Sequence, residues 1–241
     1  EYALRLINDG ADIIDVGGES TRPHARAVSV QEEIDRVIPT IGLLRKKSGV
    51  LISVDTSKMQ VAREALDAGA DIINNVNGTR MARSFLKMIS NYEAAIVIMH
   101  SRGTPRTMRS LTHYKDLLGE IIEDLSISVE KCLDSGVNLD RIIIDPGFGF
   151  AKSAQQNFSI LKQLAKFSKI KKPLLIGTSR KSFIGMATGQ DVSDRIWGTA
   201  ASVALSIAGG AHIIRVHDVK EMYQAAQVAD AVLNPELVEI K

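Results

Sequence analysis

The chain has 241 residues, of which 45% are hydrophobic and 24% are charged, a composition typical of globular proteins that excludes an intrinsically disordered one. Its 30 Lys and Arg residues nearly balance 28 Asp and Glu, and a net charge of +2 argues against nucleic-acid binding through a large basic patch. Cys132 is the only cysteine, which excludes disulfide frameworks and paired-cysteine metal or redox sites and favours a reducing, cytoplasmic location.

The longest uncharged stretch, residues 196–214, is interrupted by small residues and by the pair Gly209–Gly210. It therefore predicts a helix, a turn and a strand, and we expect no membrane span. Length and patterning predict a single domain over residues 1–241. Because the chain opens on a helical pattern and without Met, we expect this domain to be N-terminally incomplete.

Short apolar segments rich in β-branched residues alternate with helical patterns along the chain. Seven strands are predicted, which follow Asp9, Gly49, Ala68, Glu93, Arg141, Lys172 and Gly210. The clearest helical patterns cover residues 114–133, 155–167, 193–207 and 219–233. Because the strands are apolar throughout instead of alternating, we expect a parallel sheet that is covered on both faces.

A short repeat supports this organisation. It occurs as DGADIID at 9–15, AGADIIN at 68–74 and GGAHIIR at 209–215, each with a glycine that ends a helix and a strand that ends on a polar residue. A doubly wound sheet would favour a glycine-rich phosphate loop, and the chain contains neither GxGxxG nor GxxxxGK[ST]. We therefore predict an α/β fold of the (β/α)8 TIM-barrel type with its first strand absent from this sequence; a rearranged or seven-stranded barrel is the alternative.

Active sites of such barrels form at the carboxyl ends of the strands. In this chain those ends carry Asp15, Asp55, Asn74, His100, Asp145, Lys181, Arg215 and His217. Any one of them could merely cap the following helix, but polar residues at all seven ends indicate a common site. Carboxylates and an amide suit the N–H edge of a planar heterocycle, whereas Arg22, Arg215 and His217 suit phosphate oxygens. The sequence predicts a heterocycle pocket beside an anion subsite.

Five motifs resemble those of the dihydropteroate synthases, in that family's order and over nearly the whole chain. They are IDVGGESTRP at 14–23, SVDTS at 53–57, DPGFGF at 145–150, GTSRKS at 177–182 and RVHD at 215–218. The resemblance implies a (β/α)8 barrel and a transferase of folate biosynthesis. The implied reaction condenses 6-hydroxymethyl-7,8-dihydropterin diphosphate with p-aminobenzoate to give 7,8-dihydropteroate and pyrophosphate.

The resemblance also implies residue roles, motif by motif. The pterin would be bound by Asp55, Asn74, Asp145 and Lys181, of which Asp55, Asp145 and Lys181 would be catalytic. The diphosphate would be bound by Thr21, Arg22, Arg215 and His217, with Ser182 near the p-aminobenzoate. Met99 and Phe150 resemble apolar pocket walls, and plain core packing is the equal alternative.

The implied mechanism is ionisation without a protein nucleophile. Pyrophosphate leaves, the pterin ring delocalises the resulting cation, Asp55 and Asp145 favour that cation, and the neutral arylamine attacks it. Mg2+ is the implied cofactor, acting with the cationic residues on the leaving pyrophosphate. The Asn that binds Mg2+ in the family belongs to an N-terminal motif that residues 1–241 do not contain, so we name no metal ligand.

Partners and alternatives complete these expectations. The family generally dimerises, so we expect a homodimer, with Trp197 at a helix–helix or subunit contact, and fusion to other folate-pathway enzymes is an open option. His100 is interpreted as a hydrogen-bonded structural residue. The alternatives are a pterin-binding methyltransferase, which would leave the anion-binding residues without a task, a catalytically silent pterin-binding domain, and a simple phosphate-binding barrel.

Overall fold

The computed structural model describes residues 1–20, 26–104 and 107–237 of the chain. All seven predicted strands are present: β1 (Ile13–Gly17), β2 (Leu51–Asp55), β3 (Ile72–Asn75), β4 (Ala95–Met99), β5 (Ile142–Asp145), β6 (Leu175–Ile176) and β7 (Ile213–Ile214). Strands β1 to β5 form one parallel sheet in chain order, and β6 pairs in parallel with β7. A bridge between Ile144 and Leu174 continues the series from β5 to β6.

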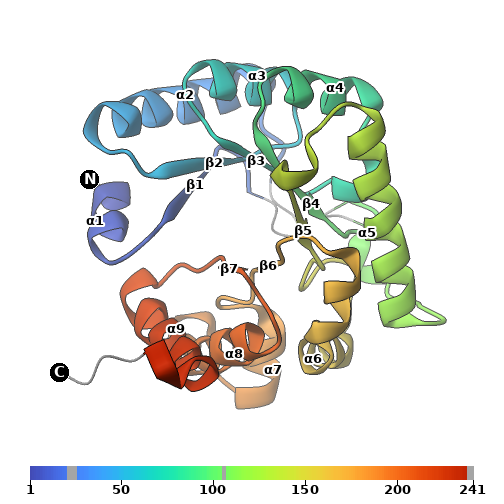
Figure 1. Cartoon of the computed structure of the whole chain (residues 1–241). Helices are drawn as coiled ribbons and strands as arrows, with labels where there is room; N and C mark the ends of the chain where they lie inside the picture. Colours follow the sequence, from blue (N-terminus) through green and yellow to red (C-terminus); the bar gives the residue numbers. More distant parts are fainter. Residues whose placement is uncertain (21–25, 105–106, 238–241) are drawn as a thin grey trace.

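Helices lie outside this curved series of strands, as Figure 1 shows. They are α1 (Tyr2–Asn8), α2 (Val30–Lys47), α3 (Met59–Asp67), α4 (Arg83–Asn91), α5 (Leu117–Asp134), α6 (Ala154–Lys162), α7 (Ser182–Thr188), α8 (Ile196–Ala208) and α9 (Val219–Leu233). Parallel strands in chain order, each followed by a helix, form the (β/α)8 TIM-barrel architecture, and seven of its strands lie in the described residues. A doubly wound sheet is excluded, since its strand order would reverse.

Local signals explain where the helices begin and end. The helix predicted over residues 114–133 begins only at Leu117, because the Asp116 carboxylate accepts a hydrogen bond from Gly119 N and caps it. The pattern over residues 155–167 is divided into α6 and the 3-10 helix Leu164–Ile170. The repeat glycines Gly10, Gly69 and Gly210 all have positive φ, as predicted for residues that follow a helix end.

Two apolar layers hold the barrel together. Its interior is filled by Ile72, Val97, Ile143 and Leu175, with Ile13, Ala95 and Ile213 packed against them. The intervening strand residues point outward and form a larger core with the helices; they include Ile14, Ile52, Val54, Ile73, Ile96, Ile98, Ile142, Ile144 and Ile176. The strands are buried on both faces, which is why they read as continuous apolar runs.

Strands β1 and β7 are the two ends of the series, and within the described part of the chain they are not paired with each other. Figure 1 shows them at neighbouring positions on the left of the barrel, where α1 and α9 also approach. A membrane-crossing helix would need about 20 predominantly apolar residues. No helix in residues 1–20, 26–104 or 107–237 meets that requirement.

Candidate active site

The alternation of side chains along the strands builds the polar end of the barrel. Residues two positions beyond the interior apolar layer share its inward direction but lie nearer the carboxyl ends of the strands. In strand order these inward residues are Asp15, Asp55, Asn74, Met99, Asp145, Gly177 and Arg215. The strand register sets Asp55 opposite Asn74 and Met99 opposite Asp145. Strands β2, β3 and β5 therefore bring both predicted catalytic carboxylates and the predicted amide to one end of the barrel.

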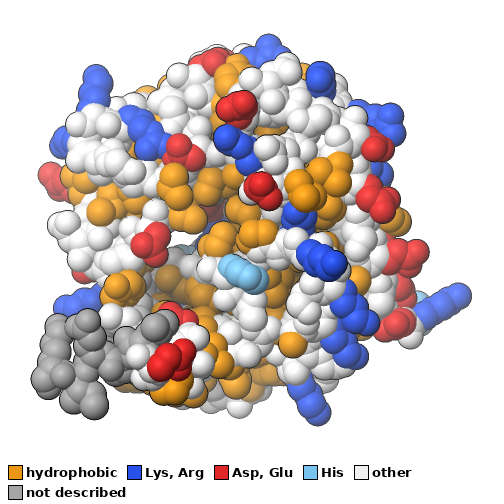
Figure 2. Space-filling view, viewed as in Figure 1, with side chains coloured by type: hydrophobic (Ala, Val, Ile, Leu, Met, Phe, Trp, Pro, Cys, Tyr) orange, Lys and Arg blue, Asp and Glu red, His pale blue; other side chains and the backbone are white. Residues whose placement is uncertain are grey.

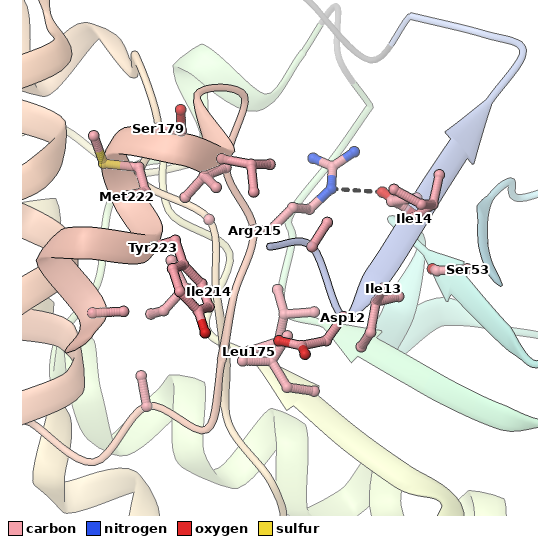
Figure 3. Close-up of a pocket in the computed structure, with 18 of the residues that line it drawn as sticks. Asp12, Ile13, Ile14, Ser53, Leu175, Ser179, Ile214, Arg215, Met222 and Tyr223 are labelled. Atoms are coloured by element: carbon pink, nitrogen blue, oxygen red, sulfur yellow. Dashed lines mark hydrogen bonds and ion pairs between the residues drawn. The ribbon is translucent and has the colours of Figure 1, made fainter. Parts of the chain in front are cut away.

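A cavity of about 630 Å³ occupies the barrel and opens between β1 and β7. Asp15, Asn74, Lys181, Arg215 and His217 line its polar part, whereas the buried Asp145 and the partly buried Asp55 are not among the lining residues. Its apolar part includes the interior layer and the face of α9 that carries Met222 and Tyr223 (Figure 3). Figure 2 shows a hollow in the middle of the molecule with hydrophobic side chains on its rim.

Arg215 joins the last strand to the first two. Its Nε donates to Asp15 Oδ2 over 2.6 Å, which Figure 3 shows as a dashed line, and its Nη2 donates to Asp55 Oδ2 over 3.1 Å. Asn74 Nδ2 also donates to Asp15 Oδ2, over 3.4 Å. Burial opposes the charge of Arg215, but Asp15 and Asp55 raise its pKa above the ordinary value. These contacts fix the guanidinium at the mouth of the predicted heterocycle pocket.

The pKa of Asp55 is strongly perturbed. Burial raises its pKa to about 7, the negative charge of Asp15 adds to the increase, and Arg215 opposes it. Near neutral pH, Asp55 can therefore either accept hydrogen bonds as a carboxylate or donate one as an acid. A group with that property is suited to a ligand whose charge changes during a reaction.

Asp145 and Lys181 form the opposite side of the predicted pterin pocket. Asp145 Oδ1 accepts a hydrogen bond of 2.7 Å from Gly147 N, and burial raises the pKa of this carboxyl above its usual range. Lys181 precedes α7, and its Nζ donates to Phe148 O and lies 4.6 Å from the centroid of the Phe150 ring. Burial lowers the pKa of Lys181 to about 8, while Asp145 holds it up.

Two residues of the predicted anion subsite, Arg215 and His217, are part of the cavity lining. His217 Nδ1 is 2.9 Å from Ser179 Oγ, which also accepts a hydrogen bond from His217 N over 3.2 Å. Arg180, in the same motif, instead forms a two-pronged ion pair with Asp218, one contact of which measures 2.9 Å. The charge of Arg180 is therefore used within the loop. Arg215, from the RVHD motif, is the arginine that lines the cavity.

The remaining predicted site residues divide into three groups. Thr21 and Arg22 lie outside the described residues. Ser182 is exposed at the first position of α7, away from the cavity lining. Met99 is buried and Phe150 is partly buried against Lys181. Both remain compatible with a pocket wall.

Two residues near the site were given no role by the sequence. Asp15 was recognised as a polar strand end, and the structure shows that it holds both Arg215 and Asn74. The sequence gives no sign of a role for Lys152, since lysines mostly lie at the solvated surface. It is buried instead, within hydrogen-bond distance of His100. His100 itself is a fully buried, hydrogen-bonded residue, in agreement with its structural interpretation.

The described residues offer little to a metal ion by themselves. Across residues 1–20, 26–104 and 107–237, no three His, Cys, Asp or Glu side chains form a group that could hold one. Asp15 Oδ1 is a buried carboxylate oxygen for which this part of the chain supplies no hydrogen-bond partner. It is one possible oxygen ligand, and a Mg2+ site would need more ligands from elsewhere.

Comparison with known proteins gives the family. Residues 1–217 match the family described as pterin binding enzyme. The dihydropteroate synthase of Synechocystis sp. is 47% identical over 230 residues, which cover 95% of this chain and 80% of that protein. The chain belongs to the dihydropteroate synthase family. The folic acid synthesis protein fol1 of Schizosaccharomyces pombe is 46% identical over 96% of this chain, which spans only 33% of that longer protein.

Solved structures of this family have the same fold. The dihydropteroate synthase of Xanthomonas albilineans in complex with 4-aminobenzoic acid superposes with a TM-score of 0.91, at 38% identity over 99% of this chain and 84% of that chain. The same protein in complex with 7,8-dihydropteroate gives a TM-score of 0.87, at 35% identity and the same coverage. The resemblance and the barrel that the sequence predicts are both confirmed.

The raised pKa of Asp55 predicts a pH-dependent stability. Between about pH 4 and 7 the folded chain binds a proton at Asp55 that the unfolded chain, with an ordinary pKa of 3.8, has lost. The free energy of unfolding should therefore fall as the pH rises through this range, by up to about 1.4 kcal/mol per pH unit. Urea unfolding at several pH values measures this free energy. Its decrease per pH unit should be smaller for Asp55→Asn than for the parent chain.

Asp134→Asn is the control for that comparison, because Asp134 is exposed at the end of α5. Its pH dependence should match that of the parent chain. Parallel curves for Asp55→Asn and the parent would show that Asp55 keeps an ordinary pKa in the folded chain.

Proposed function

We propose that this chain catalyses the dihydropteroate synthase reaction. 6-Hydroxymethyl-7,8-dihydropterin diphosphate condenses with p-aminobenzoate, and the products are 7,8-dihydropteroate and pyrophosphate. The observation that carries the proposal is the convergence of Asp55, Asn74, Asp145, Lys181 and Arg215 at one end of a barrel whose relatives bind 4-aminobenzoic acid and 7,8-dihydropteroate. Acceptors for a heterocycle and donors for an anion lie side by side there, as this substrate requires.

The pterin is bound through its polar edge. Its ring carries several N–H donors, and the carboxylates of Asp55 and Asp145 together with the side-chain oxygen of Asn74 are the matching acceptors. Asp145 uses Oδ1 for Gly147 N, and Oδ2 is oriented by that contact. Lys181 supplies the donor for the ring carbonyl from the α7 side. The pocket therefore distinguishes a pterin from a sugar phosphate, which lacks that N–H pattern.

The diphosphate is held by cations. A guanidinium has five N–H donors, and Asp15 and Asp55 accept two of those of Arg215 in the described part of the chain. Phosphate oxygens can take others without displacing either carboxylate. His217 is the neighbouring donor, and Thr21 and Arg22 are proposed to complete the subsite.

The reaction proceeds by ionisation. The bond between the exocyclic methylene carbon and the diphosphate oxygen breaks, and its electron pair leaves with pyrophosphate. The buried carboxylates of Asp55 and Asp145 stabilise the cation that remains on the pterin. The amine nitrogen of p-aminobenzoate then bonds to the methylene carbon and releases one proton. Ser182 and Phe150 are proposed to border the p-aminobenzoate.

Magnesium enters this proposal with the substrate. Diphosphate oxygens are preferred Mg2+ ligands, so the ion is proposed to arrive bound to the diphosphate. Asp15 Oδ1 can contribute one protein ligand. Bound in this way, the ion would neutralise charge on the departing pyrophosphate.

A homodimer is the proposed assembly. Trp197 is predicted at a helix–helix or a subunit contact. It is 82% exposed, so it is not packed between helices of this chain, and the subunit contact is the alternative that we propose. Leu205 on α8 and Val228 and Val232 on α9 are also exposed, and α8 packs on α9. Apolar side chains gathered on adjacent helices favour a second copy as the partner.

We also propose a cellular location for the protein and consider its fusion to other enzymes. Cys132 is a buried free thiol, which fits a reducing, cytoplasmic location. In Schizosaccharomyces pombe a similar sequence forms one third of a longer folic acid synthesis protein. Fusion to other folate enzymes is therefore compatible with this barrel.

Pyrophosphate release is the direct test of the function. The chain, supplied with the dihydropterin diphosphate, p-aminobenzoate and Mg2+, should release pyrophosphate, and omission of either the amine or Mg2+ should reduce the rate at least tenfold. A coupled phosphate assay measures the rate, and EDTA followed by Mg2+ should reverse the loss. A folded chain that binds pterin but releases no pyrophosphate would instead favour a silent pterin binder or a methyltransferase.

The two subsites should respond to different substitutions. Asp145→Asn should weaken binding of 6-hydroxymethylpterin at least tenfold, because an amide can accept with only one of its two polar atoms. Arg215→Ala should weaken binding of the pterin diphosphate much more than binding of the pterin without diphosphate. Isothermal titration with both ligands measures the difference, and equal losses for Arg215→Ala would contradict the anion role.

The dimer has a matched pair of variants. Leu205 on α8 and Leu43 on α2 are each 58% exposed. Leu205→Glu should convert the dimer to a monomer, since it places a charge in the proposed apolar contact, whereas Leu43→Glu should not. Sedimentation equilibrium measures the mass. A parent chain that is monomeric at micromolar concentration, or a dimer that survives Leu205→Glu, would contradict this interface.

A further inference from the structure

The loop between β5 and α6 is held by side chains because it has no regular secondary structure of its own. Its carbonyl groups point to different elements: Phe148 O accepts from Lys181 Nζ, and Ala151 O accepts from Tyr114 Oη over 3.0 Å. Gly149 N donates to Asn157 Oδ1 over 2.8 Å. Gly147 is at φ +73°, and a Cβ there would lie 2.0 Å from His100 O, so the loop packs directly on the backbone after β4.

Lys152 holds this loop from inside. Its Nζ lies 3.1 Å from Gly147 O, 3.0 Å from Phe150 O and 3.0 Å from His100 Nδ1. An ammonium group has three donors, and here each has an acceptor. The residue is only 8% exposed, so removal of the ammonium would take a buried donor away from His100 Nδ1 and Phe150 O and leave Gly147 O with Phe150 N as its donor.

His100 extends the contact to the protein surface. An ammonium group cannot accept a hydrogen bond, so Nδ1 is the acceptor and the proton of the neutral ring is on Nε2. That Nε2–H donates to Asp124 Oδ2, 3.2 Å away on α5. Burial lowers the pKa of His100 to about 2, and the charge of Lys152 acts in the same direction, which keeps the ring neutral.

We propose that Lys152, oriented by His100 and Asp124, is a positioning residue for pterin binding: it fixes the β5–α6 loop so that Asp145 and Lys181 take their places in the site. This inference rests on the proposed function, because the ligand it concerns is the pterin. Two links connect Lys152 with the site. Gly147, held through its carbonyl by Lys152, donates its N–H to Asp145 Oδ1. The carbonyl of Phe150 also accepts a hydrogen bond from Lys152, and the Phe150 ring lies against Lys181 Nζ.

The electrostatic interaction between Lys152 and Asp145 supports this positioning role. Burial lowers the pKa of Lys152 to about 7, and the negative charge of Asp145 is the largest effect that opposes this shift. Burial likewise raises the pKa of Asp145, and Lys152 and Lys181 both counter it. The ammonium of Lys152 therefore favours the ionised form of the carboxylate that accepts the pterin N–H groups, without contacting the ligand.

The first test compares Lys152→Met with Lys162→Met, an exposed lysine on α6. Isothermal titration with 6-hydroxymethylpterin should show at least a tenfold weaker affinity for Lys152→Met and an unchanged affinity for Lys162→Met. Amide hydrogen exchange at Gly147 and Gly149 should be faster in Lys152→Met, while exchange in β2 and β3 stays slow. General destabilisation would instead raise exchange in all of these segments.

A second pair of variants decides the question even where Lys152→Met does not fold. His100→Asn offers an oxygen close to the position of Nδ1 and should keep the pterin affinity within about threefold of the parent. His100→Leu offers no acceptor and should lose at least tenfold. Equal affinities for these two variants, or a Lys152→Met variant that binds as tightly as the parent, would overturn the inference and leave the proposed function intact. A parent chain that does not bind the pterin would overturn both.

Discussion

The two-residue period of side chains along the parallel strands of the barrel is the constraint on which this molecule depends. It divides every strand into inward and outward residues, and the outward ones bury the helices against the sheet. The inward ones fill the interior with Ile, Val and Leu up to a level where polar residues take over. A shift of one strand by one residue would exchange these two sets, so the same register that closes the core also assembles the site.

That arrangement concentrates opposite charges in a poorly solvated space. Asp15 and Asp55 share Arg215 at one side of the site, and the charges of Lys181 and Lys152 act on Asp145 at the other. Isolated charges would be very costly there, so each carboxylate has a cation beside it before any substrate arrives. Substrate binding then adds donors and acceptors to groups that are already fixed, and little reorganisation is needed when pyrophosphate leaves.

Much of this was predictable from the sequence. Continuous apolar strands and the glycine repeat predict the parallel barrel, and the carboxyl-end rule selects Asp55, Asn74, Asp145 and Arg215, because both depend on local patterns. Helix α5 begins three residues after the predicted start, because the Asp116 side chain caps it through a hydrogen bond that the sequence pattern does not reveal. Lys152 was missed because burial of a lysine depends on the elements packed around it, and nothing near it in the chain signals that environment.

The ion pair between Arg215 and Asp15 has a consequence for how the molecule folds. It connects residues 200 positions apart, from the last strand to the first. Closing so long a loop costs chain entropy, which is recovered only when the intervening strands have already assembled in order. We therefore expect the contact to form after the rate-limiting step of folding, so that its loss would speed unfolding and leave the folding rate nearly unchanged. Arg215, the proposed diphosphate ligand, thus also connects the two ends of the strand series in the described part of the chain.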